Sequence, residues 1–201
     1  MHDGRATVHY DFASVLDALP GDTVVALDMP IGLADHHEPG GREVDRAARV
    51  ELGSKRSSVF SAPPRCVLGA RTLPDARRRG GRLTLQTLSL LPRIEDVDRV
   101  LTPALQSRVF EVHPELSFAA MGDGRPVLAP KRSAAGSAER RAILQQAGVL
   151  VPARPAGAAV DDLLDACALS WSARRVVDGT ARRVPETPAC DARGLRMEIR
   201  W

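Results

Sequence analysis

Cysteine is scarce in this sequence, and its arrangement excludes two common ways of stabilising a fold. Cys66, Cys167 and Cys190 are odd in number, widely spaced and without a CxxC pair. A disulfide framework needs paired cysteines, and a structural zinc site needs closely spaced ligands. The sequence therefore predicts neither, and reduced cysteines in a cytoplasmic protein are the simplest interpretation.

The sequence also lacks a surplus of charge and any long hydrophobic run. Its 28 Lys and Arg against 25 Asp and Glu leave a formal charge of +3, which does not by itself indicate nucleic-acid binding. There is no apolar signal-peptide core, and no stretch approaches the ~18 apolar residues of a membrane span. With 201 residues, 44% of them hydrophobic, and no repeat or linker, we expect one cytoplasmic domain.

The amino-terminal part indicates strand, helix and strand in that order. Asp3-Gly4 is a hairpin-turn dipeptide, residues 6–10 favour a strand, and Asp11 is a suitable N-cap for a helix over residues 12–19. Residues 23–27 are a continuous apolar run, which is typical of a strand buried on both faces. We therefore predict that the two strands form a parallel pair.

The remaining chain predicts an α/β domain with an insertion at about residues 34–103, where periodicity is weak. We interpret this insertion as the surroundings of a site. The other predicted elements are a helix at 42–52, a Gly- and Arg-rich loop at 71–82, a second central strand at 109–112, helices at 137–146 and 160–177, and a final edge strand at 194–201.

Acidic residues lie at the predicted ends of both central strands. Asp28 directly follows the apolar run, so its carboxylate should project from the carboxyl end of a strand, where open α/β sheets build their sites. The structural alternative is that Asp28 only caps the turn at Pro30. Glu111 and Glu115 flank the end of the second strand. If the strands are neighbours, these oxygen ligands suit Mg²⁺ or Mn²⁺.

Three more acids open the helix predicted at 160–177. Asp161 and Asp165 are four residues apart, Asp162 and Asp165 are three apart, and both spacings place two carboxylates on one helix face. The alternative is that Asp161 and Asp162 are ordinary first-turn acids, which the helix dipole favours. Asp165 lies further in among apolar residues, where an acid is costly unless it is paired or bound to a metal.

Polar residues of the insertion are candidates for phosphate contacts. Asp45 and Arg49 lie on one face of the helix at 42–52, and residues 56–58 follow in a predicted loop. Such groups can hold phosphate oxygens, but a solvated helix and turn is the alternative. A lone histidine such as His113 is more often structural than a metal ligand.

Five segments in order resemble one known family. They are residues 25–33 (VALDMPIGL), 42–53 with Asp45 and Arg49, 56–60 (RSSVF) followed by Pro63 and Arg65, 111–118 (EVHPELSF), and 161–166 (DDLLDA). Over nearly the whole chain they are similar to domain-of-unknown-function family 429, whose members are predicted RNase H-like nucleases. The resemblance implies an RNase H-like mixed sheet flanked by helices and an acidic site for two metal ions.

The resemblance also implies residue roles. Asp28 matches the acid at the end of the family's fourth strand, and Asp162 and Asp165 match two acids on its last helix, so these three are the candidate Mg²⁺ or Mn²⁺ ligands. Family members begin with a Gly-x-Asp-Gly strand and a Trp-containing strand, both of which should precede Asp3-Gly4. The sequence has neither, so we expect a misassigned start or a degraded copy.

The first function that follows is metal-dependent cleavage of nucleic acid, either DNA or RNA. The candidate catalytic residues are Asp28, Glu111, Asp162 and Asp165. The candidate substrate-binding residues are Asp45, Arg49, Arg56, Ser57, Ser58, His113, Glu115 and Lys131. The alternative is a non-catalytic nucleic-acid-binding or interaction protein. Phosphoryl transfer to a small molecule is disfavoured, because there is no clear Gly-rich phosphate loop.

Overall fold

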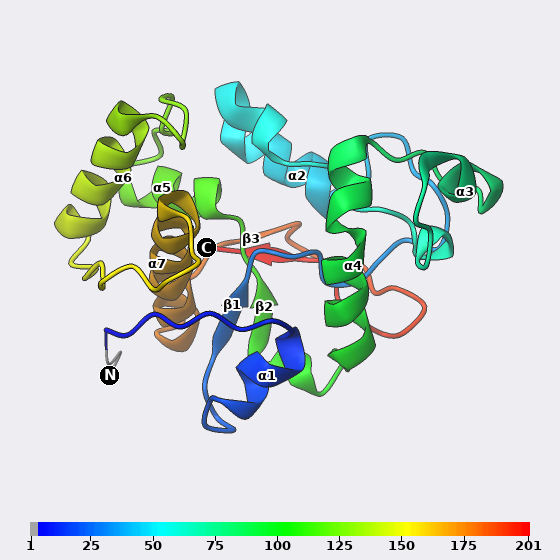
Figure 1. Cartoon of the computed structure of the whole chain (residues 1–201), viewed down its shortest axis with the longest axis horizontal. Helices are drawn as coiled ribbons and strands as arrows, with labels where there is room; N and C mark the ends of the chain where they lie inside the picture. Colours follow the sequence, from blue (N-terminus) through cyan, green and yellow to red (C-terminus); the bar gives the residue numbers. More distant parts are fainter. Residues whose placement is uncertain (1–3) are drawn as a thin grey trace.

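The computed structural model describes residues 4–201, which form a mixed sheet flanked by helices (Figure 1). The predicted α/β class is therefore confirmed. The strands are β1 (Val25–Leu27), β2 (Val109–Glu111), β3 (Arg183–Val184) and β4 (Ile199–Arg200). The α-helices are α1 (Phe12–Asp17), α2 (Glu43–Leu52), α3 (Leu73–Arg78), α4 (Leu85–Val100), α5 (Pro114–Met121), α6 (Ala134–Gln146) and α7 (Val160–Val177). Short 3₁₀ helices are η1 (Gly53–Ser58), η2 (Arg65–Val67) and η3 (Leu105–Ser107).

The order of strands in the sheet is β1-β2-β4-β3. Strand β1 runs parallel to β2, with Leu27 opposite Glu111, and β2 runs parallel to β4. Strand β3 is antiparallel to β4. Because β1 and β2 point the same way, their carboxyl ends meet at one edge of the sheet, and this is where open α/β sheets place their ligands.

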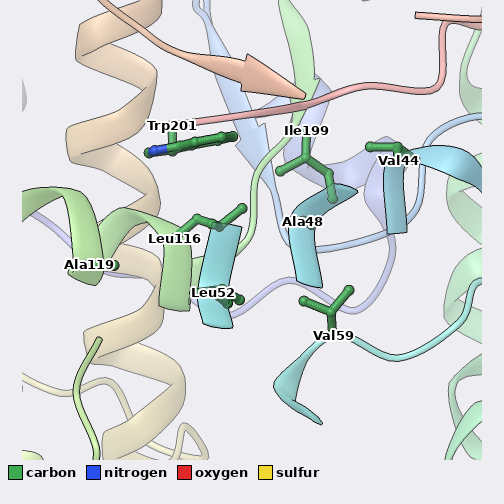
Figure 2. Packing of buried hydrophobic residues seen from close by; sticks show 8 residues of the cluster. All are labelled: Val44, Ala48, Leu52, Val59, Leu116, Ala119, Ile199 and Trp201. Carbon is green, nitrogen blue, oxygen red and sulfur yellow. The ribbon is translucent and has the colours of Figure 1, made fainter. Parts of the chain in front are cut away.

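Helices pack on both sides of the central strands. In the view of Figure 1, α5, α6 and α7 lie to the left of β1, and α4 and α3 lie to its right. Figure 2 shows one core cluster, in which Leu116 and Leu52 lie below the Trp201 ring, and Ile199 and Val44 lie to one side of it. Burying each large apolar side chain contributes roughly 1.5–3 kcal/mol. No helix within residues 4–201 has the length and apolar character needed to cross a bilayer.

Elements with strong local patterns were predicted correctly. Strands β1 and β2 fall within the two apolar runs, and α7 has the predicted bounds of Val160–Val177. Asp11 caps α1 as expected, because its Oδ1 accepts a 2.8 Å hydrogen bond from the Ser14 amide. Periodic apolar spacing and a polar cap are local signals, so they survive without knowledge of the fold.

Four predictions about individual elements were wrong. Residues 6–10 form no strand, because no described strand lies beside them as a hydrogen-bonding partner. The predicted parallel pair of this segment with β1 is therefore absent from the described residues. The Asp3-Gly4 turn lies partly outside the described residues. The carboxyl-terminal strand lies between β2 and β3 instead of at the edge, since the unpredicted β3 pairs with it. Helix α3 occupies part of the predicted loop at 71–82. The 16-residue helix α4, which has Pro92 in its interior, was not predicted, because the periodicity of the insertion is weak.

Candidate active site

A crevice of about 470 Å³ opens at the carboxyl ends of β1 and β2. Three acids from different elements line it: Asp28 directly after β1, Glu115 in the first turn of α5 and Asp165 on α7. Lys131 lines it from the loop before α6. The fold thus brings together acids that are far apart in the sequence, as the predicted neighbouring strands require.

Asp28 has the most perturbed environment of these acids. Its side chain is exposed in the crevice, yet protein atoms surround the site on most sides. Desolvation, together with repulsion from Asp165 and Glu115, raises the pKa of Asp28 to about 7, against the attraction of Lys131. An acid whose pKa is raised by neighbouring carboxylates lies in a place where a positive charge is favoured.

A buried arginine holds Glu115. Arg140 on α6 has no exposed surface, and its Nη2 donates a 2.5 Å hydrogen bond to Glu115 Oε1. The same guanidinium donates to the Ala129 and Gly136 carbonyls and lies 5.3 Å from the centre of the Phe118 ring. Glu115 Oε2 is buried and has no hydrogen-bond partner among residues 4–201. One oxygen of Glu115 is fixed, therefore, and the other is unsatisfied.

Asp165 has the same half-satisfied arrangement. Lys131 Nζ lies 3.0 Å from Asp165 Oδ2 and 3.8 Å from Asp161 Oδ2, whereas Asp165 Oδ1 is buried without a partner in the described chain. Burial raises the pKa of Asp165, although Lys131 opposes the rise. Asp162, the expected companion of Asp165, is exposed and does not line the crevice. Helix α7 instead turns Asp161, four residues before Asp165, towards this face.

The start of α6 fixes the loop that carries Lys131. Ser133 caps the helix, because its Oγ accepts a 3.0 Å hydrogen bond from the Gly136 amide. Gly136 has no side chain where one would collide: a Cβ there would lie 2.2 Å from the Pro130 carbonyl oxygen. Because Gly136 has no side chain, Pro130, which precedes Lys131, can pack directly against α6.

Glu111 and Asp45 belong to a closed ion-pair cluster with Arg42. The buried guanidinium donates to Glu111 Oε1 at 2.7 Å and Oε2 at 3.0 Å, and to Asp45 Oδ1 at 2.7 Å. The amides of Ile31 and Ala62 donate to Glu111 Oε2 and Asp45 Oδ2 at 2.7 and 2.9 Å. Desolvation would lower the pKa of Arg42, but the two carboxylates raise it. Glu111 and Asp45, predicted to act in catalysis and substrate binding, thus have no free oxygen and hold the fold together.

His113 lines the crevice with both ring nitrogens engaged. Nδ1 accepts a 3.3 Å hydrogen bond from the Glu115 amide, and Nε2 lies 3.4 Å from the Ser58 carbonyl oxygen. Burial lowers the pKa of His113, so the imidazole is neutral at neutral pH. Ser57 and Ser58 also line the crevice, as predicted phosphate contacts should. His113 therefore acts as a helix cap and brace at the crevice wall.

Two predicted phosphate contacts lie elsewhere. Arg49 donates to the Val59 carbonyl at 3.0 Å and to Ser61 Oγ at 2.9 Å, which ties α2 to the following loop. Arg56 is exposed on η1 and does not line the crevice. The predicted contact set therefore divides into groups at the crevice and groups that support the fold.

The acids suit a divalent cation in kind, but they do not form a closed cage. Carboxylate oxygens are the ligands that Mg²⁺ and Mn²⁺ prefer, and two of those at the crevice are buried and unpartnered. Within residues 4–201, no three His, Cys, Asp or Glu side chains gather closely enough to enclose an ion. Mg²⁺ is usually held by one or two carboxylates together with water and substrate phosphates. The residues present thus fit a cation that is completed by a phosphate-bearing ligand.

Comparison with known proteins gives one match. The family model described as "Protein of unknown function (DUF429)" matches residues 2–189, which include Asp28, Glu115, Lys131 and Asp165. No curated protein and no solved structure matches the chain.

Proposed function

The chain belongs to the DUF429 family of proteins of unknown function, and we propose that it is a metal-dependent phosphodiesterase of RNase H-like type acting on nucleic acid. One observation carries this proposal. Glu115 Oε2 and Asp165 Oδ1 are buried with no partner among residues 4–201, beside a crevice in which Asp28 resists ionisation. Buried acceptors are rarely left unsatisfied, since each costs about 1–3 kcal/mol, and a cation would satisfy them.

The proposed roles follow from position. Glu115 and Asp165 would hold Mg²⁺ or Mn²⁺ together with water and substrate phosphates, next to Asp28, and the bound cation would supply charge stabilisation and an activated water for phosphodiester hydrolysis. Ser57 would donate a hydrogen bond to a phosphate oxygen, whereas the Ser58 hydroxyl already donates to the Lys55 carbonyl at 2.8 Å. Lys131 would exchange its contact with Asp165 for a phosphate oxygen, and this is possible because its side chain is 43% exposed.

Cleavage assays on a matched pair of variants test this proposal. Labelled single-stranded, duplex, hybrid and branched nucleic acids are incubated with Mn²⁺ or EDTA. We expect Mn²⁺-dependent cutting that falls at least about 100-fold in Asp165→Asn, because electrostatic groups at such sites contribute factors of that order. Asp162→Asn on the same helix should cut like the unchanged protein, since Asp162 is exposed outside the crevice. Equal losses in both variants, or no cutting of any substrate, would contradict the proposal.

A specific observation also favours the second function, a non-catalytic nucleic-acid-binding protein. The Lys131 ammonium lies 3.0 Å from Asp165 Oδ2 and already neutralises this carboxylate, which a metal cation would also need. If this ion pair is permanent, the crevice binds phosphate through Lys131 without metal. Binding that is unchanged by EDTA, combined with no turnover, would identify this function.

A further inference from the structure

A second hollow of about 450 Å³ shares one lining residue, Arg93, with the acidic crevice. Helix α4 forms a wall of both: Gln86 and Ser89 on its first turns line the crevice, and Pro92 and Arg99 on its later turns line the second hollow. Arg93 lines both. A chain-like ligand lying in the crevice can therefore continue along α4 past Arg93 into the second hollow.

The side chain of Arg93 is exposed and has no hydrogen bond or ion pair with any described residue. Its acidic neighbours are already paired. Asp96 accepts a 2.6 Å hydrogen bond from the Phe12 amide and pairs with Arg99, and Glu95 pairs with Arg71 at 2.9 Å. Arg93 is thus an uncommitted guanidinium between the two hollows, with its donors available to a phosphate group.

Tyr10 stands at the second hollow with its side chain entirely in solvent. It is the sequence's single tyrosine, its relative exposure is 100%, and it lines the hollow together with Arg93. The adjacent Asp11 caps α1 through the Ser14 amide, and α1 packs against α4, so the backbone next to Tyr10 is anchored. An exposed aromatic face beside a free arginine has the chemistry of a stacking platform for an unpaired base.

We propose that Tyr10 and Arg93 form a flanking-nucleotide subsite for single-stranded nucleic acid. Arg93 contacts a phosphate between the crevice and the second hollow, and the next base stacks on the Tyr10 ring. The choice of ligand rests on the proposed function, but binding at this subsite requires no catalysis. A duplex keeps its bases stacked on one another, so the subsite selects an unpaired strand.

Fluorescence anisotropy with a labelled single-stranded oligonucleotide of ~10 nucleotides, in EDTA, tests this subsite. We expect Tyr10→Ala to weaken binding roughly 5- to 100-fold, because one base–aromatic stack contributes that much, whereas Tyr10→Phe keeps the ring and the affinity. Arg93→Ala should weaken binding and reduce the salt dependence by about one phosphate contact. Arg77→Ala, an exposed arginine on α3 that lines neither hollow, is the matched control.

An abasic nucleotide moved along the oligonucleotide locates the stacked base. At one position it should cause the same loss as Tyr10→Ala, and the two changes together should cause no further loss, because both remove the same contact. The proposed subsite would be overturned if Tyr10→Ala and Arg93→Ala both bind the oligonucleotide within twofold of the unchanged protein. It would also be overturned if the control Arg77→Ala loses as much affinity as they do.

Failure of the subsite and failure of the nuclease proposal give different results. If the subsite is wrong and the nuclease is right, Mn²⁺-dependent cutting persists with its Asp165 dependence, while Tyr10→Ala binds normally. If the nuclease is wrong and the subsite is right, no substrate is cut, while Tyr10→Ala still loses affinity that Tyr10→Phe retains.

Discussion

Two clusters near the carboxyl ends of β1 and β2 use similar parts but are completed differently. In the closed cluster, Arg42 binds Glu111 and Asp45, and all four carboxylate oxygens have partners. In the open cluster, Glu115 and Asp165 each have one oxygen bound by a cationic side chain and one buried without a partner. The same residue types therefore serve stability in one place and leave binding capacity in the other.

The difference shows that burial of an acid does not by itself indicate a functional site. Glu111 is as buried as Glu115, but its oxygens are saturated by Arg42 and the Ile31 amide. What separates the clusters is the count of unmet hydrogen-bond acceptors, since a saturated carboxylate has nothing to offer a ligand. Substitutions in the two clusters should therefore affect different measurements.

The largest expected effect is on stability, from Arg42→Met in the closed cluster. Removing one partner of a buried ion pair leaves uncompensated buried charge, which costs about 3–5 kcal/mol. Urea unfolding should show this loss in the free energy of unfolding. Arg78→Ala on α3 removes only an exposed ion pair with Asp75 and should cost less than about 1 kcal/mol. Similar losses in the two variants would mean that the Arg42 cluster contributes no more than a surface pair.

The next effect separates the clusters by paired isosteric changes. Glu111→Gln should lower stability by about 1.5–3 kcal/mol, because it removes charged hydrogen bonds, and should leave Mn²⁺ binding unchanged. Asp165→Asn should do the reverse, because its partner Lys131 is partly exposed, whereas Arg42, the partner of Glu111, is buried; burial raises the pKa of both acids and does not separate them. Calorimetric Mn²⁺ titration and urea unfolding of both variants would show whether Glu111 supports stability and Asp165 supports Mn²⁺ binding. Loss of both stability and Mn²⁺ binding in each variant would contradict this prediction.

A smaller effect concerns the pH dependence of stability through Asp28. Its pKa rises from 3.8 to about 7 on folding, so the folded state binds the proton more tightly. The resulting stabilisation is complete below about pH 4 and is lost as the pH rises to about 7. Asp28→Asn should therefore gain stability relative to the unchanged protein with rising pH, by about 1 kcal/mol above pH 7 after allowance for solvent screening. Thermal unfolding of both proteins between about pH 4 and pH 8 measures this difference in stability. A difference that stays constant over this pH range would contradict the prediction.

The smallest effect is expected at Lys131. Lys131→Gln removes the ammonium that competes with a cation for Asp165, so Mn²⁺ affinity should rise by about two- to fivefold, as suits a partly exposed ion pair. Lys55→Gln replaces the only other lysine in the sequence, and it should leave the affinity unchanged. Weaker Mn²⁺ binding in Lys131→Gln would show that the ammonium supports the site instead of competing for it.

Part of the fold and the site could be predicted because their signals are local. The apolar run before Asp28 predicted a strand with an acid at its end, and the spacing of acids in α7 predicted carboxylates on one face. The expectation that this strand is buried on both faces was wrong, because β1 lies at an edge of the described sheet and only its Val25 is buried. Choosing between Asp161 and Asp162 needed the packing of α7, since both spacings suit a helix. Helix α4, which carries Arg93, was missed because the apolar periodicity of the insertion is weak, and its interior Pro92 is unusual in a helix.

By itself, the sequence determined the two central apolar runs, the long closing helix and the acids Asp28, Glu115 and Asp165, because hydrophobic periodicity and strand ends are properties of neighbouring residues, whereas the pairing of the strands needed the tertiary structure. Only the tertiary structure decided which charged side chains are paired with one another and which keep free hydrogen-bonding atoms. Arg42 and Arg140 look like ordinary surface arginines in the sequence, yet both are buried and bind carboxylates from distant segments. Whether a carboxylate keeps a free oxygen depends on those distant partners, and no local pattern encodes them.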